Sequence, residues 1–213
     1  KFVDGKWTDK HLEYWSFLQE DYKWLESKNV FAVKDWAMGI KSKMSKMRPT
    51  KDEITFAYYA PEIDKCKILR IGPEIKIEDK WRNTVPNDYL FYYNDYVNKE
   101  CDDGFIVKSV KDCLLLHNFG RCAIAVQTAS AKILLDNSIN KINSLFKNPI
   151  VLYGSDNQGK KESIEITKQT GWKWFNIENH LYSQFGIEDP TDYIKEGGFT
   201  LKQLNNKLKE KGF

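Results

Sequence analysis

Ile150–Lys161 reads IVLYGSDNQGKK, and this segment indicates the class of fold to which the chain belongs. Strand-forming apolar residues run up to Tyr153, a short polar loop with one carboxylate follows, and a helical pattern begins near Gly159. A buried strand that leads through a short loop into a helix is typical of parallel α/β sheets. Because ligands and metal ions bind at the carboxyl ends of such strands, Asp156 lies where a site is expected.

The same alternation of strands and helices runs through the second half of the chain. It predicts an α/β fold, a parallel sheet flanked by helices. Because parallel crossovers are right-handed, the loops after Val107, Val126, Tyr153 and Ile177 should share one edge. The expected strands cover 105–108, 122–126, 149–153 and 172–176, and the expected helices cover 110–118, 131–146, 159–170 and 201–211.

The first half has a different pattern of predicted secondary structure, in which short helices are followed by short strands. We expect helices near 9–18 and 21–26 and strands at 30–33, 54–59 and 67–71, which together indicate a small α+β region with an antiparallel sheet. Polar residues and a glycine at Asp102–Gly104 break the pattern. The sequence therefore predicts an N-terminal α+β region at 1–102 and an α/β domain at 103–213.

Composition places the chain among ordinary globular proteins. With 213 residues it can bury a core without a metal or a disulfide to hold it. The four cysteines show no Cys-x-x-Cys spacing, which favours a reduced setting, and the sequence has neither a signal-peptide pattern nor an apolar run of about twenty residues. We therefore expect a soluble cytoplasmic protein with no membrane partner. A start at Lys1 rather than Met indicates a fragment or a trimmed product.

The net charge of +3 is mild, so charged partners must be sought in local patterns. Lys43, Lys46 and Arg48 lie in a basic run, and the chain holds seven tryptophans, eleven tyrosines and twelve phenylalanines. Such a combination serves single-stranded nucleic acid, because basic groups follow the phosphates while aromatic rings stack on bases. The alternative is that the rings fill a core and the lysines solvate a loop, and for any single residue this is the commoner case.

Acidic residues follow three of the predicted strands at the common edge of the sheet. Asp112 lies one turn into the helix after the first strand, Asp156 follows the third strand, and Asp189 with Asp192 follow the fourth. Carboxylate oxygens are the ligands that Mg²⁺ prefers in proteins. The alternative for each acid alone is a helix cap or a turn residue, which is common at such positions.

Other groups of residues are weaker candidates for a functional site. Lys160 and Lys161, at a helix start, can bind phosphate together with backbone N–H groups, although solvated helix lysines are commoner. The three histidines have no partner at ligand spacing, so neither a zinc site nor a Cys-His nucleophile is expected. The segment 154–161 is not a P-loop, because it ends in a lysine rather than a hydroxyl residue.

These segments together resemble the Toprim domain, the metal-dependent catalytic domain of bacterial-type and phage DNA primases. A Toprim domain carries a Glu at the end of its first strand and an Asp four residues later, then an Asp-x-Asp-x-x-Gly loop after its third strand. Here Lys108 holds the Glu position and Gly154 that of the first loop Asp, while Asp112, Asp156 and Gly159 are in register.

Other parts of the chain extend the resemblance. The segment 189–192, Asp-Pro-Thr-Asp, matches the last acidic motif, and the region before residue 103 is loosely similar to the segment that precedes Toprim in phage proteins. Some phage members carry a Lys-Ser-x-Lys-Asp motif, as here at 108–112, together with a Glu shortly after the Gln that follows the second strand. Ala129 holds that place in this chain, so two expected acids are absent.

The resemblance implies a nucleotidyltransferase that makes RNA primers on a single-stranded DNA template from nucleoside triphosphates. It also implies a replicative helicase as partner and, for a phage-encoded chain, the cytoplasm of a bacterial host as location. The implied residues fall into three groups: Asp112, Asp156, Asp189 and Asp192 for Mg²⁺ or Mn²⁺; Asp112, Asp156 and Lys111 for catalysis; Lys108, Lys160, Lys161, Lys43, Lys46 and Arg48 for phosphates and DNA.

The missing acids leave a second hypothesis open. Lys108 brings a cation to a place where metal chemistry needs an anion, and loss of a metal carboxylate normally cuts catalysis by orders of magnitude. The domain is then either a primase with a reduced metal site or a non-catalytic Toprim-fold module that binds nucleic acid or a replication partner. A Toprim nuclease ranks third, because that activity needs the full set of acids even more.

Overall fold

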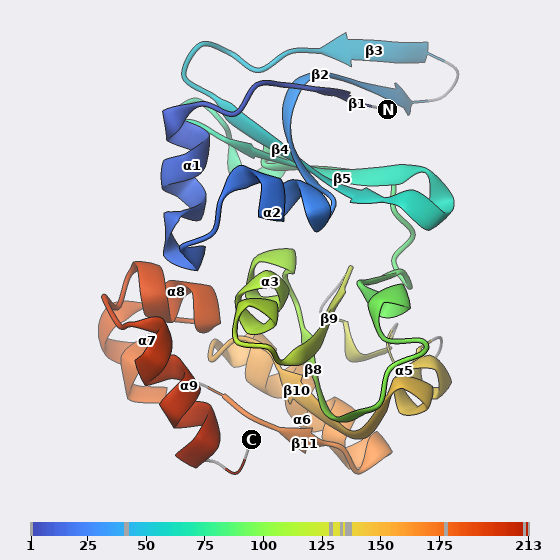
Figure 1. Cartoon of the computed structure of the whole chain (residues 1–213), viewed down its shortest axis with the longest axis vertical. Helices are drawn as coiled ribbons and strands as arrows, with labels where there is room; N and C mark the ends of the chain where they lie inside the picture. Colours follow the sequence, from blue (N-terminus) through green and yellow to red (C-terminus); the bar gives the residue numbers. More distant parts are fainter. Residues whose placement is uncertain are drawn as a thin grey trace. The chain divides into compact units, whose positions relative to one another are not determined.

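The computed structural model of the chain describes residues 2–40, 43–127, 130–132, 134, 138–176, 179–210 and 212, with the backbone alone at 38–40, 43–46, 179–180, 182 and 201. Two compact units make up the chain, Lys1–Val85 and Pro86–Phe213 (Figure 1). We describe each unit by itself.

The first unit is an antiparallel sheet with two short helices. The sheet has the order β1-β2-β4-β5-β6, and β3 also pairs with β2. Its helices are α1 (Asp9–Trp15) and α2 (Tyr22–Ser27), and its strands are β1 (Phe2–Asp4), β2 (Val30–Ile40), β3 (Lys43–Met47), β4 (Ile54–Ala60), β5 (Lys65–Ile71) and β6 (Trp81–Asn83).

Aromatic rings pack helix α1 of the first unit against its sheet. Phe56 of β4 is fully buried, and its ring lies 5.2 Å from those of His11 and Tyr14 and 5.7 Å from that of Trp15, all on α1. Buried aromatic pairs contribute beyond the area that they bury. These rings therefore fill a core, which was the alternative to a base-stacking role.

A buried ion pair crosses from the start of β4 to β5. The side chain of Glu53 is fully buried and that of Arg70 is 15% exposed. Arg70 donates through Nε at 2.7 Å and through an Nη at 3.0 Å to the two carboxylate oxygens of Glu53, and Thr55 donates its hydroxyl at 2.8 Å. Burial acts to raise the pKa of Glu53, but these hydrogen bonds, from Arg70 above all, bring the pKa below its ordinary value.

The second unit is a five-stranded sheet in the order β11-β10-β8-β9-β7. Strands β8, β9, β10 and β11 are parallel, and β7 pairs antiparallel with β9. Its described strands are β7 (Leu90–Phe91), β8 (Cys101–Val107), β9 (Cys122–Val126), β10 (Phe146–Leu152) and β11 (Lys173–Trp174), and its helices include α3 (Val110–Asn118), α5 (Ile139–Leu145), α6 (Asn157–Thr170), α7 (Asn179–Phe185), α8 (Pro190–Lys195) and α9 (Leu201–Glu210).

The parallel strands are apolar on both faces, as the sequence predicted. Ile106, Ile124 and Val151 pack against helix residues that include Ile142 and Ile166 in one cluster, and their strand neighbours Phe105, Ala123 and Ile150 are buried as well. Continuous burial of this kind is expected of a parallel sheet that is covered by helices. The α/β fold class and the preceding antiparallel sheet are thus confirmed.

Several boundaries differ from the sequence prediction. The division between the units falls after Val85, whereas the expected boundary at residue 102 lies inside β8, because this strand begins at Cys101. The helix predicted over 131–146 is confirmed over α5, and β10 begins directly after it at Phe146. The helices α7 and α8 and the strand β3 were not predicted. Residue 177, named as the end of a strand, lies outside the described residues.

A disulfide joins Cys101 to Cys122. The two residues are 21 positions apart and have no Cys-x-x-Cys spacing, so the sequence favoured free thiols. They become neighbours because β8 and β9 are adjacent parallel strands and each cysteine is the first residue of its strand, which leaves the two Cα atoms 6.4 Å apart. The expectation of a fully reduced chain is therefore corrected for this pair, while Cys66 and Cys113 are buried thiols.

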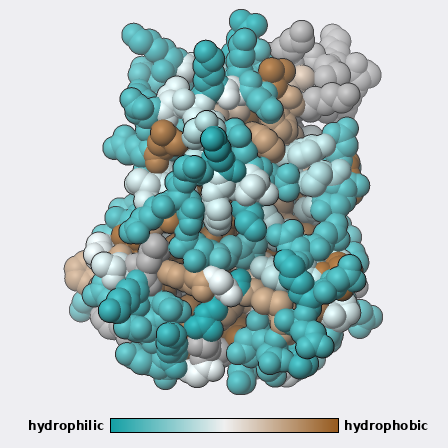
Figure 2. Space-filling model, in the orientation of Figure 1, coloured by the Kyte–Doolittle hydropathy of each residue, from teal (hydrophilic) through white to brown (hydrophobic). Residues whose placement is uncertain are grey.

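Hydrophilic residues predominate on the face that Figure 2 shows, and the exposed large apolar side chains include Ile77 and Phe185, which are 90% and 68% exposed. No helix in the described part of the chain is both long enough and apolar enough to cross a membrane.

We expect Arg70→Met to lower the free energy of unfolding by about 3 kcal/mol, the lower end for a broken buried ion pair, because Glu53 would keep an unpaired buried charge while Arg70 itself is partly exposed. Urea unfolding measures the change. Lys10→Met is the matched control, since the pair of Lys10 with Asp52 has side chains 62% and 65% exposed and should contribute little. Equal effects of the two substitutions would contradict the role of the Glu53–Arg70 pair.

Candidate functional site at the strand ends of the parallel sheet

The loops after β8 and β10 lie side by side at the carboxyl ends of these strands. Val107 pairs with Leu152 in the parallel register, so Lys108 and the loop at 153–156 start at the same level. The segment before α8 joins them, because the backbone N–H of Ser155 donates to the carbonyl of Glu188 at 2.7 Å. Three segments far apart in the sequence thus form one edge.

An ion-pair cluster occupies the middle of this edge. The ammonium nitrogen of Lys108 lies 3.5 Å from Oε2 of Glu188 and 4.0 Å from Oδ1 of Asp156. The three side chains are 22%, 39% and 24% exposed, so solvent reaches the group but does not surround it. Asp156 also caps α6, accepting from the N–H of Gly159 at 2.8 Å. We call Lys108, Asp156 and Glu188 the Lys108 cluster.

Two glycines make this packing possible. A Cβ atom at Gly154 would overlap the ammonium of Lys108 and would lie 3.0 Å from Oδ1 of Asp156. A Cβ at Gly159 would overlap the carbonyl oxygen of Gly154. The loop therefore packs directly on the start of α6, and the absence of a side chain at 154 leaves the space that Lys108 fills.

Asp112 lies beside this cluster in a fully hydrogen-bonded position. Its side chain is 1% exposed. Oδ1 accepts from the backbone N–H and the hydroxyl of Thr191 at 3.0 and 2.7 Å, and Oδ2 accepts from the hydroxyl of Ser109 at 2.5 Å. Ser109 in turn caps α3 by accepting from the N–H of Asp112 at 3.1 Å. Asp112 thus anchors the start of α8 to the start of α3.

Asp112, Asp189 and Asp192 form a second group, which we call the acid cluster. Burial raises the pKa of Asp112 to about 7, and the charge of Asp189 acts in the same direction against Lys111 and the hydrogen bonds. Burial and Asp189 likewise raise the pKa of Asp192. Asp189 caps α8 by accepting from the N–H of Asp192 at 2.9 Å. Lys111 is near enough to lower the pKa of both acids.

The four acids predicted to bind Mg²⁺ or Mn²⁺ are divided between these two clusters. Asp156 belongs to the Lys108 cluster, and Asp112 has hydrogen-bond donors on both oxygens. Among the described residues, no three Asp, Glu, His or Cys side chains come together in a way that could hold a metal ion. The side chains present therefore do not fit a divalent cation in this arrangement.

The remaining predicted residues are placed as follows. Lys160 and Lys161 lie in the first turns of α6, and the N–H of Lys160 donates to the carbonyl of Asp156 at 3.0 Å. Arg48 pairs with Asp35 of β2 at 2.7 Å and is 81% exposed. The side chains of Lys43 and Lys46, on β3, and all of Ala129 lie outside the described residues.

Sequence reasoning missed Glu188, Thr191 and Lys195. Glu188 directly precedes the Asp-Pro-Thr-Asp segment and Thr191 lies within it, so that motif was the available signal. Lys195 follows Asp192 by one helical turn; burial and then the charge of Lys111 lower its pKa. The sequence did not indicate the partners of Glu188 and Thr191, because their contacts reach residues about eighty positions away.

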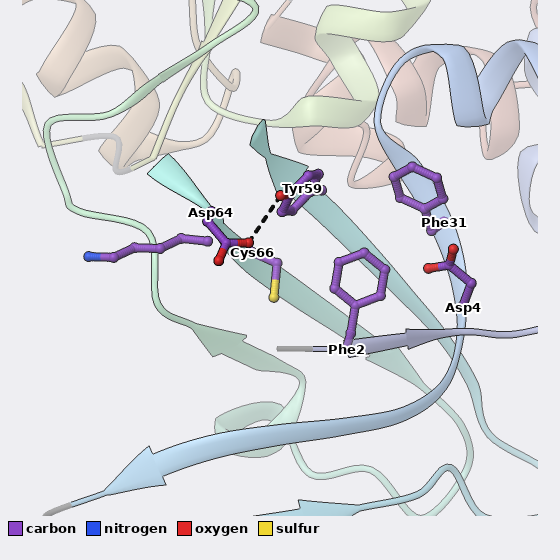
Figure 3. A pocket seen from close by; sticks show the side chains of 7 residues that line it. Phe2, Asp4, Phe31, Tyr59, Asp64 and Cys66 are labelled. Atoms are coloured by element: carbon purple, nitrogen blue, oxygen red, sulfur yellow. Dashed lines mark hydrogen bonds between the residues drawn. The ribbon is translucent and has the colours of Figure 1, made fainter. Parts of the chain in front are cut away.

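A separate pocket of about 360 Å³ lies on the first unit, and Figure 3 shows it between β1 and the strand residues Tyr59 and Cys66. The ring of Phe2 lies 5.7 Å from that of Phe31 and 5.8 Å from that of Tyr59, so these rings pack on one another. Tyr59 donates its hydroxyl to Asp64 at 3.0 Å. The pocket contains none of the predicted site residues.

No family model and no curated protein matches the chain. Among solved structures it is similar to the primase fragment of the bacteriophage T7 primase-helicase protein, with a TM-score of 0.56, 12% identity, and coverage of 85% of this chain and 66% of that one. A DNA primase domain from Pseudomonas aeruginosa aligns at a TM-score of 0.48 and 14% identity, covering 91% of this chain and 67% of that one. The chain shares the fold of the T7 fragment and spans about two thirds of its length.

We expect the free energy of unfolding of the wild type to fall as the pH rises from about 4 to about 7, while that of Asp112→Asn does not show this fall. The difference between the two proteins should change by up to about 1.4 kcal/mol per pH unit. The ordinary pKa of 3.8 lies below the folded value of about 7, so the native state binds more protons in this range and loses stability as they leave. Asn can keep the bonds to Thr191 and Ser109 but cannot titrate.

Urea unfolding across this pH range measures the effect. Asp88→Asn, which removes an exposed carboxylate from the same unit, is the control and should follow the wild type. Parallel pH profiles for the wild type and Asp112→Asn would contradict the assigned pKa shift.

Proposed function

We propose that this chain is a phage-type DNA primase-like protein of DNA replication, with a Toprim-like site at the carboxyl ends of β8 and β10. The observation that supports the proposal is that charged side chains gather at the carboxyl ends of these parallel strands, where α/β sheets bind ligands. In a fold shared with the T7 primase fragment, this edge collects Lys108, Asp156 and Glu188 with the acid cluster beside them. Single-stranded DNA and nucleoside triphosphates are the proposed ligands.

Phosphate groups are the part of these ligands that the edge suits best. Lys108 is 22% exposed and the backbone start of α6 lies next to it, so an ammonium and a helix N-terminus with Lys160 and Lys161 meet at one loop. Ammonium groups and unpaired helix N–H groups both bind phosphate. The basic segment with Lys43, Lys46 and Arg48 is the proposed guide for DNA on the first unit.

The form of the function that the geometry supports best is a non-catalytic one, a module that keeps the primase fold to bind nucleic acid or a replication partner such as a helicase. Two arrangements support it. Asp112 has three donors on its carboxylate, and Asp156 and Glu188 already share a cation in Lys108. Because these residues do not fit Mg²⁺ or Mn²⁺, we derive no catalytic step through a metal.

Metal-dependent RNA primer synthesis is the second candidate. One observation favours it: the charge of Asp189 acts on both Asp112 and Asp192, so three acids lie close together next to Glu188. Primer synthesis is a phosphoryl transfer that bound Mg²⁺ assists by neutralising charge on the phosphates. In this form Asp156, Asp189 and Asp192 would be the ligands, and Lys111 would contact the nucleotide.

We expect the chain to bind a labelled single-stranded oligonucleotide with an affinity that falls as salt rises. The double variant Lys160→Gln/Lys161→Gln should bind more weakly, with the slope of log affinity against log salt reduced by about 0.7 for each phosphate that the lysines no longer neutralise. Fluorescence anisotropy measures both quantities. Lys168→Gln, on an exposed lysine in the last turn of the same helix, is the matched control and should change neither.

A primer-synthesis assay with nucleoside triphosphates and Mg²⁺ separates the two forms. Binding without RNA product supports the non-catalytic module, and a product that Asp156→Asn abolishes supports the primase. A chain that binds neither single-stranded DNA nor nucleoside triphosphate would contradict both the primase and the nucleic-acid-binding module, and would leave only the module that binds a replication partner.

A further inference from the structure

We propose that Lys108 is a built-in cation, whose ammonium takes the place of a divalent metal ion at the strand-end edge, and that Gly154 provides the room for it. The inference deepens the proposed function, on which it rests for the identity of the phosphate ligand. The part of the inference that concerns the packing of Lys108 and Gly154 rests on the described contacts alone. The inference predicts that the strand-end edge folds without a bound metal ion.

The charges at the edge support this inference. Asp156 and Glu188 each place a carboxylate oxygen within 4.0 Å of the same ammonium nitrogen. Two carboxylates so close to one point need a positive charge between them, since like charges in a partly buried place repel. A divalent ion would have to enter beside an ammonium that already supplies that charge, and would be repelled by it.

Backbone hydrogen bonds fix the carboxylate of Asp156 and the main chain of Glu188, and neither bond involves the ammonium of Lys108. Asp156 is fixed by its bond to the N–H of Gly159 at 2.8 Å, and the carbonyl of Glu188 accepts from Ser155 at 2.7 Å. Loss of the ammonium would therefore leave the anchored carboxylate of Asp156 and the carboxylate of Glu188 next to the space that the ammonium had filled. Oxygen ligands in such an arrangement suit Mg²⁺ and Mn²⁺.

Position 154 is coupled to this arrangement. A Cβ at Gly154 would overlap the Lys108 ammonium and crowd Oδ1 of Asp156. A longer side chain at 154 and an ammonium in its present place therefore exclude each other. The lysine and the glycine act as one unit, in which the space left by the missing side chain is filled by the cation.

The test uses the full chain and the metal alone as probe. Lys108→Gln should be less stable than the wild type without metal and should gain saturable Mn²⁺ binding by calorimetry, at least ten-fold tighter than the wild type. Mg²⁺ or Mn²⁺ should raise its Tm and leave that of the wild type unchanged. Lys168→Gln removes one charge from the same unit and should gain nothing. Adding Asp156→Asn to Lys108→Gln should remove the gain.

Equal metal affinity in Lys108→Gln and the wild type would overturn the proposal. If Lys108→Gln does not fold, Mn²⁺ titration of the wild type and of Asp156→Asn tests the proposal independently. Wild-type binding that Asp156→Asn abolishes overturns the built-in cation, and no such binding supports it. No arm contains DNA or nucleotide, so a failure of DNA binding and a failure of this inference are separate results.

Discussion

The parallel pairing of β8 with β10 governs the chemistry of the second unit. By setting Val107 level with Leu152, it brings the side chain of Lys108 over a loop that has no side chain at Gly154. The contacts of the Lys108 cluster depend on that meeting, because it places the ammonium within 4.0 Å of the carboxylates of Asp156 and Glu188. A shift of register by one residue would turn Lys108 to the other face of the sheet.

Asp112 contributes the second constraint, which acts on the helices rather than on the strands. A buried carboxylate is costly unless donors surround it, and here Ser109 and Thr191 supply three. The position of α8, and with it those of Glu188 and Asp189, therefore depends on one side chain in the first turn of α3. The same residue type that serves metal ligation in other sites serves helix docking in this one.

Much of the fold was predictable because its signals are local. The apolar run into β10, the helical spacing of α6 and the C-cap Gly171, with a φ of 74°, all appear within a few residues of sequence. The capping alternative for Asp156 and Asp189 was local too, and both side chains do cap helices. What sequence could not supply was pairing at long range. The contact of Lys108 with Glu188 spans eighty positions and depends on how a loop before α8 folds back, which no short motif encodes.

The Cys101–Cys122 bond has a consequence for the motion of the second unit. The covalent ring that it closes contains β8, the whole of α3 and the start of β9, and therefore also Lys108 and Asp112. The bond ties the first residue of β8 to the first residue of β9, and it therefore lowers the conformational entropy that the segment 101–122 gains when it unfolds. In a reducing buffer, openings that separate β8 from β9 should therefore cost less free energy, and amide hydrogen exchange in these two strands should become faster.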